Sequence, residues 1–114
     1  MPVTTDPHNA ITVTHMDGIA SIHVAGELDV ETSPSLRACL LDVIPRTKVV
    51  VVDLAELGFI DSTGIGVLIG AAKRLAAEGG EIRLQGVRPK TLRVFEITGV
   101  DRIIDIEPAP ARPR

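Results

Sequence analysis

In this chain of 114 residues the dipeptide Asp17–Gly18 separates two stretches of alternating apolar and polar residues. Asp-Gly is favoured in the two-residue turns that connect antiparallel strands. Pairing residues outward from this turn places apolar side chains opposite one another on one face, with threonine, serine and histidine on the other. The expected pairs are Met16 with Ile19, His15 with Ala20, Val13 with Ile22, Ile11 with Val24, Thr12 with His23 and Thr14 with Ser21. The sequence therefore predicts a β-hairpin with one apolar face.

A helix and a central strand are predicted after the hairpin. Ser33–Pro34 is typical of an N-cap followed by proline in the first helical turn. Apolar residues at helical spacing follow, and Pro45 ends the predicted helix. The run Val49–Val52 is apolar without alternation, which favours a strand buried on both faces of a sheet. We expect this strand to end near Leu54 and a short loop to follow it.

The rest of the chain alternates helices with short strands. The predicted elements are a long helix from Ser62 or Thr63 to Gly79–Gly80, a strand around Ile82 and Leu84, a helix from Pro89 to Gly99, and a last strand or turn around Ile103, Ile104 and Ile106. Strands separated by helices imply parallel crossovers, whereas the hairpin adds an antiparallel edge. The predicted fold is α/β, a single layer of mixed β-sheet packed against helices in the order β-β-α-β-α-β-α with a short final strand.

One folded domain is expected, because domains commonly run to about 100–150 residues. Residues 1–9 are polar and irregular and residues 107–114 are rich in proline, so both segments are expected to be flexible. The folded domain is then residues 10–106. With 45% hydrophobic and 24% charged residues, the composition is that of an ordinary globular protein.

Charge and cysteine content narrow the possible functions. The net charge is −3 and basic residues form no cluster, so we expect no direct contact with nucleic acid. No apolar stretch approaches the ~20 residues that cross a bilayer, and the N-terminus does not resemble a signal peptide, so a cytoplasmic protein is expected. Cys39 is the single cysteine, which excludes an intrachain disulfide and a multi-cysteine metal site, and we expect it in the core.

The most informative segment joins the central strand to the long helix, where Asp61 precedes Ser62 and Thr63. One interpretation is structural, because a hydroxyl at a helix N-terminus accepts hydrogen bonds from the free amides of the first turn and stabilises the helix by ~1 kcal/mol. Capping needs only one hydroxyl, and it does not explain the small residues that follow at helical spacing. These residues are Gly66 and Gly70, in line with Ser62, and Val67 and Ala71, in line with Thr63.

Glycine inside a helix requires a reason, because it destabilises the helix by ~1 kcal/mol relative to alanine. One explanation is close approach of another element of the same chain at Gly66 and Gly70. The other is a smooth docking surface for a partner, with Ser62 at its edge. The pattern alone leaves both explanations open.

Four motifs occur in the same order as the predicted elements. They are Gly26-Glu27-Leu28-Asp29, Val51-Val52-Asp53-Leu54, Phe59-Ile60-Asp61-Ser62-Thr63-Gly64-Ile65-Gly66-Val67-Leu68 and Phe95-Glu96-Ile97-Thr98-Gly99-Val100. With them the chain resembles the STAS domain, and most closely the stand-alone bacterial anti-sigma factor antagonists. The resemblance covers roughly residues 10–106, and the Asp-Ser-Thr-Gly block is its most specific part.

The resemblance implies a phosphorylation switch. In that family the serine after the aspartate is phosphorylated by the anti-sigma factor, itself an ATP-dependent serine kinase, and the matching residue is Ser62, with Thr63 as the alternative. The unphosphorylated antagonist binds the kinase and frees a sigma factor, and a serine phosphatase resets it. The resemblance and the small-residue pattern together predict a set of partner-binding residues. They are Asp29, Asp61, Ser62, Thr63, Gly66, Val67, Gly70 and Ala71. No cofactor, no metal ion and no enzymatic activity are expected.

Nucleotide binding is a weaker alternative. Gly64, Gly66 and Gly70 have the spacing G-x-G-x-x-x-G, whereas dinucleotide-binding loops have G-x-G-x-x-G. No acidic residue ends the following strand, which such a site would use to bind the ribose.

Two further alternatives concern hydrolysis and scaffolding. Hydrolysis by Ser62 would need a neighbouring base, but the three histidines are His8 in the N-terminal segment and His15 and His23 in the hairpin, and no G-x-S-x-G motif occurs. His15 and His23 are expected to be ordinary strand residues. A STAS subunit that acts as a scaffold in a lipid-transport or stress-signalling complex remains the main alternative.

Overall fold

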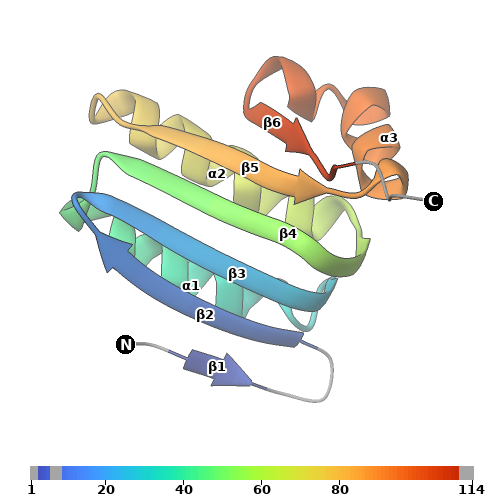
Figure 1. Cartoon of the computed structure of the whole chain (residues 1–114), viewed down its shortest axis with the longest axis horizontal. Helices are drawn as coiled ribbons and strands as arrows, with labels where there is room; N and C mark the ends of the chain where they lie inside the picture. Colours follow the sequence, from blue (N-terminus) through green and yellow to red (C-terminus); the bar gives the residue numbers. More distant parts are fainter. Residues whose placement is uncertain (1–2, 6–8, 111–114) are drawn as a thin grey trace.

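A computed structural model describes residues 3–5 and 9–110 of the chain. In these residues a six-stranded sheet has the order β1-β2-β3-β4-β5-β6 (Figure 1). The strands are β1 (Val3–Thr5), β2 (Asn9–Met16), β3 (Ile19–Leu28), β4 (Val49–Ile60), β5 (Glu81–Val87) and β6 (Asp105–Pro108). The helices are α1 (Ser33–Val43), α2 (Ser62–Ala77) and α3 (Pro89–Thr98), with 3-10 turns η1 (Ile44–Arg46) and η2 (Val100–Arg102). The first three strands are antiparallel and β3 to β6 are parallel, which confirms the predicted mixed α/β sheet.

The β2–β3 hairpin has the predicted register. All the expected pairs form, and the turn residues Asp17 and Gly18 adopt φ values of 53° and 79°. Two consecutive residues with positive φ are what the type I′ turn requires. The apolar face of the hairpin, with Ile11, Val13, Ile22 and Val24, is fully buried.

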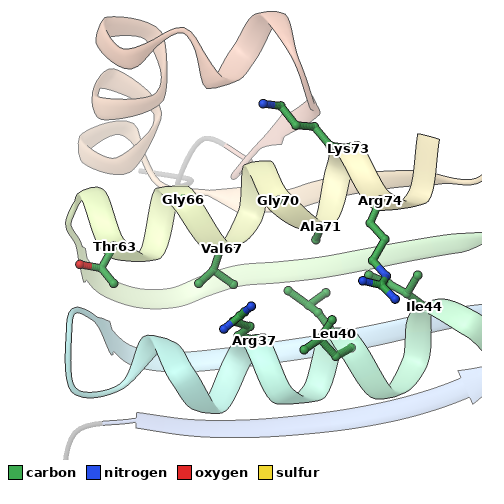
Figure 2. A pocket seen from close by; sticks show the side chains of 11 residues that line it. Arg37, Leu40, Ile44, Thr63, Gly66, Val67, Gly70, Ala71, Lys73 and Arg74 are labelled. Carbon is green, nitrogen blue, oxygen red and sulfur yellow. The ribbon is translucent and has the colours of Figure 1, made fainter. Parts of the chain in front are cut away.

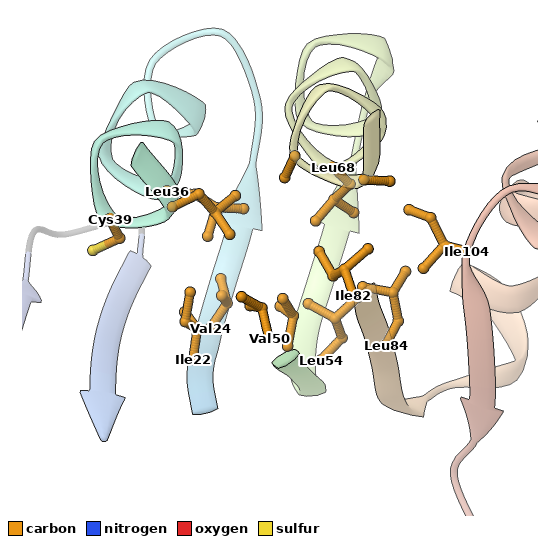
Figure 3. Close-up of a cluster of buried hydrophobic side chains, with 14 of the residues drawn as sticks. Ile22, Val24, Leu36, Cys39, Val50, Leu54, Leu68, Ile82, Leu84 and Ile104 are labelled. Carbon is orange, nitrogen blue, oxygen red and sulfur yellow. The ribbon is translucent and has the colours of Figure 1, made fainter. Parts of the chain in front are cut away.

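Helices α1 and α2 lie on the same face of the sheet and bury it, while the opposite face is open (Figure 3). Burial alternates along β4: Val50 and Val52 are fully buried, whereas Val49 and Val51 are half-buried on the open side. The prediction that Val49–Val52 is buried on both faces is therefore wrong. Valine is favoured in strands by its β-branched shape, so an unbroken valine run does not require a covered second face.

The core between the helices and the sheet consists of aliphatic side chains. Leu36 and Cys39 of α1 and Leu68 of α2 point toward the strands (Figure 3). Cys39 is buried as predicted, and this burial raises the pKa of its thiol. Of the helices in the described residues, none combines the length and apolar composition needed to cross a bilayer.

Strand β4 is longer than predicted. The sequence suggested a loop after Leu54, but β4 continues to Ile60 because its second half pairs with β3 across two register shifts. Leu28 and Ile60 form the last pair of the two strands. The residues that follow them, Asp29 and Asp61, therefore leave the sheet at the same edge.

Both ends of the described chain form strands where irregular segments were expected. Val3–Thr5 pairs with β2, and β6 continues to Pro108, after which the amide of Ala109 donates to the carbonyl oxygen of Val87 (2.9 Å). Proline is tolerated here because β6 is an edge strand. The remaining residues of the two segments, 1–2, 6–8 and 111–114, lie outside the described residues. The division into a domain and two flexible ends stays a prediction.

The open face of the sheet carries a charged cluster around His23. Its Nε2 lies 2.6 Å from Oε2 of Glu56 and its Nδ1 lies 3.5 Å from Oδ2 of Asp53. The hydrogen bond to Glu56 raises the pKa of His23 above its ordinary value, partial burial opposes this, and Asp53 adds to the increase. His23 was expected to be an ordinary strand residue, and this cluster was not predicted because Glu56 was expected in a loop.

We predict that the stabilisation by His23 depends on pH. Because the pKa of His23 is raised in the folded state, its protonated form stabilises the fold. This stabilisation is fully present below the ordinary pKa of ~6.5 and is lost as pH rises through the folded-state pKa. The His23→Gln variant should therefore lose a few tenths to ~1 kcal/mol of unfolding free energy at about pH 6, because the pair is largely exposed, and less at about pH 8.5. Urea unfolding at the two pH values measures the difference.

His15→Gln is the matched control, because His15 makes no ion pair among the described residues. An equal loss for His23→Gln at both pH values would show that the cluster does not act through the charge of the imidazole.

Candidate functional site

The N-terminus of α2 is capped by Asp61. Asp61 has an extended backbone (φ −112°, ψ −172°), and its Oδ1 accepts hydrogen bonds from the amides of Thr63 (2.8 Å) and Gly64 (3.3 Å). Capping by the hydroxyl of Ser62 or Thr63, one of the two interpretations of the sequence, is therefore excluded, and the helix begins at Ser62, one of its two expected starts. A carboxylate competes well for these amides because the helix dipole favours negative charge at this end. The Ser62 hydroxyl is thus not needed for capping.

Ser62 and Thr63 are both exposed at this end of the helix. Neither hydroxyl makes a hydrogen bond to another group of the described residues. A side chain in such a position is accessible to an enzyme that modifies it.

Close packing fixes the start of α2 against the sheet. The amide of Asp61 donates to the carbonyl oxygen of Leu28 (3.0 Å). A Cβ placed on Gly64 would lie 2.8 Å from Cβ of Leu28 and 2.9 Å from Cγ1 of Ile60, closer than carbon atoms normally approach. Only glycine at position 64 allows the helix to begin so near the ends of β3 and β4.

The loop after β3 is organised by Asp29. Its Oδ1 accepts hydrogen bonds from the amides of Glu31 (2.9 Å) and Thr32 (3.0 Å), while its own amide donates to Oγ1 of Thr32 (2.9 Å). The Thr32 hydroxyl donates to the carbonyl oxygen of Glu27 (2.7 Å), and Thr32 occupies the N-cap position of α1 that was predicted for Ser33. Asp29 therefore has a structural role in addition to its expected place beside the phosphorylation site.

Two apolar side chains at this edge were not among the predicted site residues. Val30, in the loop, is 69% exposed, and Phe59, near the end of β4, is 47% exposed. Single exposed apolar residues are common on protein surfaces, so these two side chains add to a binding surface only together with the polar residues beside them. Phe59 could not be recognised from its sequence context, because its exposure depends on which face of β4 it occupies.

The outer surface of α2 bears on the first of the two explanations for its glycines, the close approach of another element. A Cβ on Gly66 or on Gly70 would meet no atom within 4 Å. No other element of the described chain therefore approaches either glycine, and the explanation by close approach is excluded. Val67 is half-buried and Ala71 is buried, so these two face α1 and are less accessible than expected.

A groove of about 640 Å³ lies between α1 and α2 (Figure 2). Thr63, Gly66, Val67, Gly70 and Ala71 of α2 form one wall, so the predicted small-residue surface is part of this groove. The opposite wall comes from α1 and η1. Its residues are Arg37, Leu40, Leu41 and Ile44.

The geometry does not favour the alternatives of nucleotide binding and hydrolysis. Gly64, Gly66 and Gly70 lie inside α2 and not in a loop before it, so they form no phosphate-binding loop. His23 lies on the open face of the sheet, opposite the face that α2 covers, and is engaged by Glu56. His8 lies outside the described residues.

We predict opposite effects of alanine at the helical glycines. Gly66→Ala and Gly70→Ala should each raise the unfolding free energy by roughly 0.5–1 kcal/mol, because the space is open and alanine favours helix. Gly64→Ala is the contrasting variant and should lose about 1–3 kcal/mol through overpacking against Leu28 and Ile60. Urea unfolding of the three variants provides the test, and destabilisation by Gly66→Ala would mean that its surroundings are not open.

Comparisons with known proteins agree with this geometry. A family model of the STAS domain matches residues 10–112. The anti-sigma-B factor antagonist of Bacillus subtilis (strain 168) is 35% identical over 85 residues, which are 75% of this chain and 78% of that protein. The crystal structure of an anti-sigma factor antagonist from Mycobacterium paratuberculosis has a TM-score of 0.81 at 27% identity, covering 92% of this chain and 91% of that one.

A third match, the phosphorylated form of the Bacillus cell fate determinant SpoIIAA, shares the fold with a TM-score of 0.69 at 23% identity, over 84% of this chain and 89% of that one. The resemblance seen in the sequence motifs is confirmed over nearly all of the described residues. The chain belongs to the STAS domain family and, within it, to the anti-sigma factor antagonists.

Proposed function

We propose that this protein, when unphosphorylated, binds an anti-sigma factor that is also a serine kinase and thereby frees a sigma factor. Phosphorylation of Ser62 by that kinase ends the binding, and a serine phosphatase restores it. The observation that carries the proposal is the exposed hydroxyl of Ser62 at the first position of α2, left without a capping role because Asp61 caps the helix. The protein acts as a binding partner in the cytoplasm and catalyses no reaction itself.

The charge of a phosphate on Ser62 suits such a switch. A phosphoserine adds about −1.5 to −2 charges, and a helix N-terminus tolerates them. However, Asp61 already accepts hydrogen bonds from the amides of Thr63 and Gly64, so fewer donors remain for the phosphate. Asp61 itself, and Asp29 at the same edge of the sheet, add negative charge. The phosphate would therefore lie in surroundings that repel it once a partner excluded water.

The expected effect on binding is large. An unpaired charge buried at an interface costs about 2–5 kcal/mol, which corresponds to a loss of affinity of roughly 30-fold to several thousand-fold. The fold need not change, because the Asp29 loop and the Gly64 contact are held by interactions that do not involve the Ser62 hydroxyl. The switch is thus local electrostatics at an interface.

We predict that Ser62 is the single phosphorylation site. The purified protein is incubated with Mg·ATP and each anti-sigma kinase of its own cell, and the intact mass is recorded for the wild type, Ser62→Ala and Thr63→Ala. One added phosphate is expected on the wild type and on Thr63→Ala and none on Ser62→Ala. Thr63→Ala is a matched control, because it removes the neighbouring exposed hydroxyl but keeps the amide that Asp61 binds.

Other outcomes would contradict the proposal in different ways. A phosphate on Ser62→Ala but not on Thr63→Ala would move the site to Thr63. No phosphate with any kinase, on a protein that unfolds cooperatively, would favour the scaffold function.

A further inference from the structure

The groove between α1 and α2 has an apolar floor and a basic rim (Figure 2). Leu40 and Ile44 face Val67 and Ala71 across it, while Arg37 and Arg74 extend into it from opposite walls. Lys73 also lines the groove but points away from α1 in this view. No acidic residue is among the lining residues of the described chain.

The two arginines are available for a partner. Arg37 makes no ion pair with any described carboxylate. Arg74 reaches Glu78 only at 4.0 Å, and both side chains are more than half exposed, so this pair contributes little. An arginine that lies beside apolar side chains and lacks a carboxylate presents a fork of donors for an incoming one.

The wall of the groove on α2 is bare backbone at two positions. Gly66 and Gly70 lie one helical turn apart, and a Cβ at either would point into open space. Glycine at both positions weakens the helix, and nothing in the described fold requires it. The missing side chains widen the groove so that another chain can approach the axis of α2 closely.

We propose that this groove binds an amphipathic segment of the anti-sigma factor that carries acidic side chains. Apolar residues of the segment pack on Leu41 and Val67, above the nearly buried Leu40 and Ala71, and its carboxylates pair with Arg37 and Arg74. This inference rests on the proposed function. The groove is continuous with the site of that function, because Thr63 lines its end and Ser62 is the adjacent residue. A phosphate on Ser62 then repels the acidic segment directly, which links the switch to the groove.

Two other occupants fit the charges less well. A second copy bound through the same groove around a two-fold axis would bring the arginines of both copies together. The C-terminal segment of the chain carries Arg112 and Arg114, of the same sign as the groove. An acidic segment from a different protein has the complementary charge.

The experiment measures the dissociation constant between the anti-sigma kinase and this protein by calorimetry, with a non-hydrolysable ATP analogue so that Ser62 stays unmodified. The variants are Arg37→Glu, Arg74→Glu and Gly70→Leu, with Ser62→Glu as a mimic of the phosphorylated state. Arg93→Glu is the matched control, because Arg93 is exposed on α3 outside the groove and its reversal changes the net charge equally. Unfolding curves verify that each variant is folded.

We expect Arg37→Glu and Gly70→Leu each to weaken binding by roughly tenfold or more, and Arg93→Glu to change it by less than about twofold. Gly70→Leu should at the same time be at least as stable as the wild type, because leucine favours helix and a Cβ at this position meets no atom within 4 Å. If Gly70→Leu binds more weakly although it is at least as stable as the wild type, the lost affinity comes from the filled groove and not from unfolding. Replacing acidic residues of the kinase with lysine should restore its binding to Arg37→Glu when the replaced residues belong to the segment that occupies the groove. This restoration identifies the segment.

Three results would overturn this inference. In the first, Ser62→Glu abolishes binding but Arg37→Glu and Gly70→Leu leave it unchanged. The partner then does not use the groove, while the proposed function stands. In the second, the wild type self-associates and Gly70→Leu abolishes this self-association but leaves kinase binding intact. The groove then binds a second copy of this chain. If no anti-sigma kinase binds the wild type, the proposed function and the assignment of the groove both fail.

Discussion

The position of Ser62 depends on the contact between the first turn of α2 and the ends of β3 and β4. The amide of Asp61 is bound to the carbonyl oxygen of Leu28, and Gly64 lies so close to Leu28 and Ile60 that a methyl group would not fit. A larger residue at position 64 would displace the helix from the edge of the sheet and Ser62 with it. The geometry of the site thus rests on one backbone hydrogen bond and one absent side chain.

The order of the strands explains why the groove and Ser62 share one surface. Strands β3, β4 and β5 are neighbours in sequence order, and the connections between them run through α1 and α2. Crossovers between parallel strands are almost always right-handed, so successive crossovers in one direction place their helices on the same face. The two helices therefore lie side by side, and the groove between them begins where α2 begins. An interface at Ser62 can extend along this groove without any change in the fold.

Local chemistry made much of the fold predictable, and non-local pairing accounts for most errors. The register of the hairpin followed from Asp17–Gly18, and the left-handed Gly99 ends α3 as expected (φ 83°). The continuation of β4 to Ile60 could not be predicted, because it depends on pairing with β3 across register shifts. At the site, the sequence indicated a helix that starts at Ser62 or Thr63 and suggested a hydroxyl as one interpretation of the cap, whereas the helix starts at Ser62 and Asp61 caps it. Three neighbouring side chains can cap a helix, and only the extended backbone of Asp61 decides among them.

The glycines of α2 link stability to function. Alanine at Gly66 or Gly70 would fit the space and strengthen the helix, so the chain is less stable than its fold allows. Natural proteins keep such destabilising residues where activity needs an open or strained surface. Here the open surface joins an exposed hydroxyl, beside acidic residues, to a basic groove with an apolar floor. In the proposed switch, negative charge added at Ser62 would weaken partner binding without any need to move the backbone, because the two ends of this surface differ in charge.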